Sequence, residues 1–175
     1  MSVDVRYPIG KHQMVPFSQE EKEARLADIL FLPRMLEYAV LNLNDDQIQT
    51  PYRDGGWTVN QVIHHVADSH MNAFIRFKLA LTEENPIIKP YIQDKWGETP
   101  DVLNVPVNIS ITLLHSLHHR WYELLKTMQD ADWKRTLHHP EQKRDISLWE
   151  MLLIYAWHGK HHAAHVTNLR EQMGW

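Results

Sequence analysis

Apolar residues repeat at helical spacing in four long stretches of the chain. The second and third stretches show the repeat most clearly, at Val62, Val66, Ala73, Phe77 and Leu81 and again at Leu114, Leu117, Trp121, Leu124 and Met128. Spacings of three and four place these side chains along one face of an α-helix. No segment shows the sustained alternation that is typical of a half-buried β-strand. The pattern therefore predicts a bundle of four long helices.

Three of these helices begin with a capping signal, in which Ser or Thr is followed three residues later by Glu or Gln. The signals are Ser18 with Glu21, Thr58 with Gln61, and Ser147 with Glu150. We expect helices over about residues 18–43, 59–84, 109–128 and 147–173, with Gly174 at the final stop. Pro33 should kink or divide the first helix, because proline removes one backbone hydrogen bond and clashes with the preceding turn.

The segments between the helices are rich in proline. Residues 1–17 predict an extended N-terminal arm, and residues 85–107, with four prolines, predict a long connection that wraps over the body. Long loops in compact domains are often functional. We find no internal repeat and no linker, so residues 1–175 should form a single domain.

Composition narrows the functional class. The 175 residues are 43% apolar and 23% charged, as in a soluble globular protein. The formal charge of −4, from 18 basic and 22 acidic residues, argues against a nucleic-acid binder. No apolar run approaches the roughly 20 residues of a membrane helix, and the start of the chain lacks a secretory signal pattern. We expect a cytoplasmic protein whose partner is a small molecule.

The chain has no cysteine but 13 histidines. A thiolate nucleophile and a cysteine zinc site are excluded, so any thiol chemistry needs a thiol from outside. Histidine is the commonest protein metal ligand. Two ligands on one helix must lie three or four residues apart, and three histidine pairs have the wider spacing: His115/His119, His158/His162 and His161/His165.

Helical phase separates the three pairs. His158 and His162 lie on or beside the apolar stripe of the last helix and should face the bundle interior, where bundle metal sites are built. The pair His161/His165 falls on a line with polar residues and should be more exposed. His115 and His119 lie on a solvated face. The alternative for His158 and His162 is a pair of hydrogen-bonded core histidines.

The second helix supplies the third candidate ligand. His65 lies on a polar line with Ser69, Asn72 and Arg76, which predicts a lined cavity, and His64 is its main competitor. Asp68 could accept a hydrogen bond from a ligand imidazole, or could be a surface carboxylate. His118, on the third helix, is either a core histidine or a group that supports a ligand.

Two segments carry a resemblance to a known family. The sequence YRDGGWTVNQVIHHVADSHMN at 52–72 and the sequence WHGKHHAAH at 157–165 resemble the DinB superfamily, specifically its YfiT-type group of metal-dependent hydrolases. The resemblance implies an all-α, antiparallel four-helix bundle, often a homodimer. It also implies one zinc or nickel ion held by the second histidine of the His-His pair and by both histidines of His-x-x-x-His, here His65, His158 and His162.

Three functions are compatible with such a site. In a hydrolase, the ion would activate water. In a thiol S-transferase, which relatives of this type resemble, it would activate bacillithiol, and Arg76 would hold a carboxylate of that thiol unless it forms a surface salt bridge. The third possibility is a metal-binding stress protein without turnover. Asp68 and Arg76 are the candidate catalytic residues, and no general base is identified.

Overall fold

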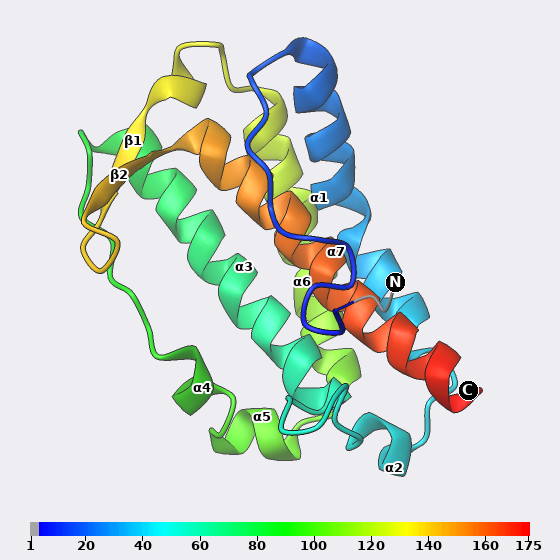
Figure 1. The fold of residues 1–175 in the computed structure, drawn as a ribbon. Coiled ribbons are helices and arrows are strands. Elements are labelled where there is room, and N and C mark those ends of the chain that lie inside the picture. Colours follow the sequence, from blue (N-terminus) through cyan, green and yellow to red (C-terminus); the bar gives the residue numbers. More distant parts are fainter. Residues whose placement is uncertain (1–3) are drawn as a thin grey trace.

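The four long helices expected from the apolar repeats are present in the computed structural model, which describes residues 4–175 (Figure 1). They are α1 (Gln19–Val40), α3 (Val59–Thr82), α6 (Val107–Lys126) and α7 (Leu148–Met173). α1 packs against α6 and α7, and α3 packs against the same two helices. The predicted four-helix bundle is therefore confirmed, with α1 and α3 at opposite corners.

The capping signals act as expected. The side chains of Ser18, Thr58 and Ser147 each accept a hydrogen bond from the backbone N–H three residues later. At Thr58 the box is complete, because Gln61 also accepts from the Thr58 N–H. Gly174 ends α7 in the left-handed region, with φ of 72°, where glycine has no Cβ penalty. These caps fix the start of both helices that carry the predicted ligands.

Pro33 lies buried within α1, and the helix continues through it from Gln19 to Val40. Of the two outcomes expected for Pro33, a kink or a division of the helix, the division does not occur. Packing of the buried face of α1 against α6 and α7 outweighs the loss of one backbone hydrogen bond.

Contacts along the helices give their directions. His64 and Phe77 of α3 contact Ser110 and Trp121 of α6 in the same order, so α3 and α6 run parallel. In contrast, α3 and α7 are antiparallel, and so are α1 and α6. The segment between α3 and α6 must return the chain to its starting end, which explains its length. It contains the short helices α4 (Gln93–Trp96) and α5 (Pro100–Asn104), while α2 (Asp45–Ile48) precedes α3.

A small β-hairpin replaces the loop expected between the last two long helices. After a short turn, η1 (Asp132–Lys134), strand β1 (Thr136–His139) pairs antiparallel with β2 (Arg144–Ser147). Leu137 and Ile146 pair with each other and are buried against the end of the bundle. Each strand has four residues, too few to show a sustained alternation in the sequence.

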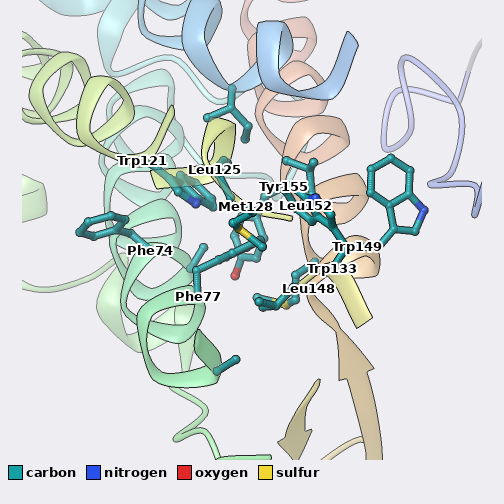
Figure 2. Close-up of a cluster of buried hydrophobic side chains, with 14 of the residues drawn as sticks. Phe74, Phe77, Trp121, Leu125, Met128, Trp133, Leu148, Trp149, Leu152 and Tyr155 are labelled. Atoms are coloured by element: carbon teal, nitrogen blue, oxygen red, sulfur yellow. The ribbon is translucent and has the colours of Figure 1, made fainter. Parts of the chain in front are cut away.

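Aromatic side chains fill the end of the bundle next to the hairpin. Figure 2 shows Phe77, Trp121 and Trp133 among the buried residues of this cluster. The predicted N-terminal arm, described over residues 4–17 because residues 1–3 lie outside the described part of the chain, runs along α7 (Figure 1). It is held there by Trp149 and Trp157, whose indole N–H groups donate to the carbonyls of Val15 and Gly10. No helix within residues 4–175 is long and apolar enough to cross a membrane.

Candidate metal centre

The structure brings the three predicted ligands together. His65 comes from α3, and His158 and His162 come from consecutive turns of α7. Each offers one ring nitrogen, and these atoms lie within 4.8 Å of one another. The Nε2 atoms of His65 and His158 are 3.3 Å apart. Three imidazole nitrogens thus converge on one point in the bundle.

Local packing holds α7, and with it two of the three ligands, in place. Gly159 directly follows His158, and α1 packs closely against it. A Cβ at position 159 would lie 2.3 Å from Cδ2 of Leu32, well inside van der Waals contact. Glycine therefore permits the close approach of α1 and α7 at the level of the centre. On the other side of α7, the antiparallel α3 brings His65 to His162, with ring centroids 4.9 Å apart.

Burial keeps these imidazoles neutral. It lowers the pKa of His65 to about 4. It also lowers the pKa values of His158 and His162 well below the usual 6.5, with a smaller contribution from the neighbouring histidines. Neutral imidazoles carry the lone pairs that a divalent ion needs. His162 also has a buried Nδ1 without a hydrogen-bond partner among the described residues. This donor set fits a divalent metal ion.

His70 supports the centre from behind, a role that the sequence analysis did not assign. Its Nε2 lies 3.1 Å from Nδ1 of His158, and its Nδ1 lies 3.0 Å from Nε2 of His118. His118 in turn contacts the backbone carbonyl of Ile29. His118 is therefore a core histidine, and through His70 it is connected to the candidate ligand His158. A role for it in supporting a ligand stays a prediction. The spacing of five between His65 and His70 was a weak signal, because it does not place both on the same helical line.

His64 is excluded as the third ligand. Its Nδ1 lies 2.7 Å from Ser110 Oγ, and its Nε2 lies 2.9 Å from the carbonyl of Val105. Both ring nitrogens are thus occupied away from the cluster. His115 and His119 are exposed, as expected for a solvated face, and His115 contacts Glu37.

The expectation that His161 and His165 are more exposed is wrong. Their exposed fractions are only 7% and 4%. Trp157 and Tyr52 stack on them, with ring centroids 4.4 Å from His161 and 4.0 Å from His165. The N-terminal arm adds Tyr7 over His161. Helical phase predicts burial only from packing between the bundle helices. The arm and the loop before α3 also cover the outer face of α7, and phase does not include them.

Asp68 lies on α3, half-buried, one turn beyond His65. Burial raises the pKa of its carboxyl to about 6, with a further contribution from Asp101. His70 makes a hydrogen bond to the candidate ligand His158. Among the described residues, no hydrogen bond connects Asp68 to any of the three histidines. A supporting role for Asp68 stays a prediction.

Arg76 lines a cleft that reaches the centre. Its guanidinium donates to the hydroxyl of Tyr155 at 3.3 Å and to the carbonyl of Lys89 at 3.2 Å. Within residues 4–175 it forms no salt bridge with a carboxylate, so the surface ion pair considered above is not observed. The cleft has a volume of about 520 Å³, and its polar lining includes Ser69, Arg76, Tyr91, His139, Tyr155 and His158.

A larger cavity, of about 690 Å³, lies between the arm and the helices α1 and α7. His12, Trp157 and Lys160 line it, but none of the three candidate ligands does. The smaller cleft, which His158 borders directly, is therefore the candidate substrate site.

Comparison with known proteins places this geometry in a family. Proteins of Bacillus mycoides strain KBAB4 and Bacillus cereus strain 03BB102 are each 49% identical over 173 residues, covering 98% of this chain and 99% of theirs. Both have the provisional name of metal-dependent hydrolase.

A solved structure and a family profile agree with these relatives. YfiT from Bacillus subtilis matches with a TM-score of 0.95 and 46% identity, over 98% of both chains. That protein is described, also provisionally, as a metal-dependent hydrolase with an unusual four-helix bundle topology. The profile of the DinB superfamily matches residues 29–166. This chain belongs to the DinB superfamily.

Proposed function

We propose that this protein is a metal-dependent hydrolase in which His65, His158 and His162 hold one zinc or nickel ion. The observation that carries the proposal is the convergence of three neutral ring nitrogens within 4.8 Å beside a cleft. Sites with three protein ligands are typically catalytic, because a further position stays open. The names of the relatives support the same reading.

The chain's own residues have separate tasks in this proposal. A bound ion would supply a Lewis acid that lowers the pKa of water toward neutrality. Arg76 directs a fixed positive charge into the cleft and would bind an anionic group of the substrate. The hydroxyl of Tyr155, which accepts from Arg76, holds the guanidinium in position. Asp68 is the candidate for proton transfer, because a carboxyl with a pKa of about 6 changes its protonation near neutral pH.

Thiol transfer is the second candidate function, and the cleft-facing Arg76 favours it. In this alternative the cosubstrate is bacillithiol, whose carboxylates Arg76 would bind. The thiolate sulfur attacks an electrophilic carbon, the leaving group departs with its electron pair, and the thiol proton passes to solvent. The chain has no cysteine, so the reacting sulfur must come from the cosubstrate.

One experiment separates these functions. The full chain is loaded with zinc or nickel and incubated with an alkyl halide or an ester, each with and without bacillithiol. Ester cleavage without thiol supports hydrolysis, and consumption of the halide only with thiol supports transfer. Metal binding without turnover in any arm contradicts both and supports a metal-binding stress protein. His119→Ala, on the solvated face, is the control for each arm.

A further inference from the structure

A line of buried imidazoles connects the backbone of α1 with the metal centre. His118 Nδ1 lies 2.5 Å from the carbonyl oxygen of Ile29. His118 Nε2 lies 3.0 Å from His70 Nδ1, and His70 Nε2 lies 3.1 Å from His158 Nδ1. The side chains of His70 and His118 are fully buried, with no exposed surface. The line ends at His158, whose Nε2 faces the candidate metal position beside His65.

The direction of every hydrogen bond in this line follows from its first member. A carbonyl oxygen only accepts, so His118 must donate from Nδ1. A neutral imidazole has one N–H, which makes His118 Nε2 an acceptor and His70 Nδ1 a donor. By the same step, His70 Nε2 accepts from His158 Nδ1. The lone pair of His158 is then left on Nε2, the atom that faces His65.

We propose that the Ile29 carbonyl, acting through His118 and His70, fixes the tautomer of His158 that can bind the metal. His118 and His70 are positioning residues, because neither is a candidate ligand. The surroundings support this assignment. Trp121 and Tyr155 pack edge-on against His70, with ring centroids at 5.8 and 5.3 Å, and shield the line from water that could exchange its protons.

Pro33 explains why the Ile29 carbonyl is available to His118. In an α-helix, the carbonyl of residue 29 accepts from the N–H of residue 33. Proline has no N–H, so α1 leaves this carbonyl without its usual partner. The buried carbonyl needs a donor, and His118 supplies it. Pro33 thus leaves the Ile29 carbonyl available as the acceptor at which the line of histidines begins.

Spectroscopy of the metal-free protein tests the line directly. Long-range ¹H–¹⁵N spectra of histidine-labelled protein at pH 7.5 should show the proton on Nδ1 of His118, His70 and His158. A proton on Nε2 of any of the three would overturn the proposal. The inference rests on the proposed metal site, but this measurement involves no metal. Its result is therefore independent of whether wild-type protein binds zinc.

Metal affinity gives the second test, with zinc and a competing chelator as the probe. His70→Phe, which removes the partner of a ligand, should weaken zinc binding about 10–100-fold. His118→Phe should weaken it by about tenfold. His118→Gln should restore most of this loss, because an amide can donate to Ile29 and accept from His70.

The matched control is His119→Phe, an exposed substitution on the same helix, which should leave the affinity unchanged. Unchanged affinity in His118→Phe, or no rescue by His118→Gln, would contradict the proposal. Failure of the wild type to bind zinc would instead contradict the proposed function.

Discussion

The imidazole of His118 on α6 donates a hydrogen bond to the backbone carbonyl of Ile29 on α1, across the interface of two antiparallel helices. The two residues are 89 positions apart in the sequence. Their contact joins two helices without any candidate ligand, and His70 of α3 extends it to His158 of α7. Substitutions at positions outside the centre should therefore change both the stability of the fold and the affinity for metal.

Pro33→Ala should reduce metal affinity, although residue 33 contacts no ligand. Alanine restores a backbone N–H, which competes with His118 for the Ile29 carbonyl. A carbonyl can accept two hydrogen bonds, so we expect a smaller loss than in His118→Phe. Zinc competition measures it. Affinity equal to or above that of the wild type would show that the proline is irrelevant to the centre.

His162→Ala should abolish metal binding while preserving the fold. The substitution removes one of the three candidate ligands. The cavity that it leaves should lower the free energy of unfolding by a few kcal/mol at most, since even larger core side chains cost only about 2–5 kcal/mol when truncated to alanine. Elemental analysis should give one ion per chain for the wild type and near zero for the variant, with similar far-UV circular dichroism. His119→Ala should behave as the wild type. Full metal content in His162→Ala would disprove the ligand assignment.

The metal-free protein should lose stability as the pH falls below 6.5. Burial lowers the pKa of His118 to about 4, whereas the unfolded chain titrates near 6.5. Between these values the unfolded state binds a proton that the folded state does not, so acid favours unfolding. The contribution is complete above pH 6.5 and is lost progressively down to about pH 4.

His118→Gln isolates this effect. At about 1.4 kcal/mol per pH unit, the wild type should lose roughly 2 kcal/mol more than the variant between pH 7.5 and pH 5. Urea denaturation of both metal-free proteins at the two pH values measures the difference. Equal losses would mean that His118 does not remain neutral in the folded protein.

Arg76→Gln should weaken the binding of an anionic substrate without changing metal content. Hydrogen bonds to charged groups contribute about 1.5–3 kcal/mol, which corresponds to a rise in KM of about tenfold or more. Steady-state kinetics with bacillithiol or an anionic ester tests this. Lys78→Gln, an exposed cation on the same helix, is the control. A fall in kcat alone, at unchanged KM, would argue against a substrate-binding role.

Gly159→Ala should destabilise the protein and disturb the centre. The new Cβ would overlap Leu32, which is buried in the core. Overpacking costs about 1–3 kcal/mol, which exceeds the gain of up to about 1 kcal/mol from replacing a helical glycine. We expect a Tm several degrees lower by thermal denaturation. Gly97→Ala, where the Cβ meets only ordinary contacts of 3.5 Å and beyond, should change Tm little.

The sequence was sufficient for features that depend on one helix at a time. Periodicity and caps located the four long helices to within about three residues, and helical phase correctly placed His115 and His119 on an exposed face. Features that depend on several segments were missed. The burial of His165 depends on Tyr52, and the role of His70 depends on His118, a residue of another helix.

The hairpin was missed for a different reason. Its strands are short, and their burial is decided by the end of the bundle rather than by a local repeat. The path of the connection between α3 and α6 could not be predicted from the sequence either. Prolines marked it as irregular, but its return to the starting end follows only from the parallel packing of the two helices.

The arm has a consequence for the order of events during synthesis on the ribosome. The indole groups that hold the arm belong to α7, and so do two of the three candidate metal ligands. The segment that forms α7 emerges after every other helix of the bundle. Residues 4–17 therefore have no surface to pack against until more than a hundred further residues have been synthesised. Docking of the arm and completion of the candidate metal centre both become possible only at this last stage.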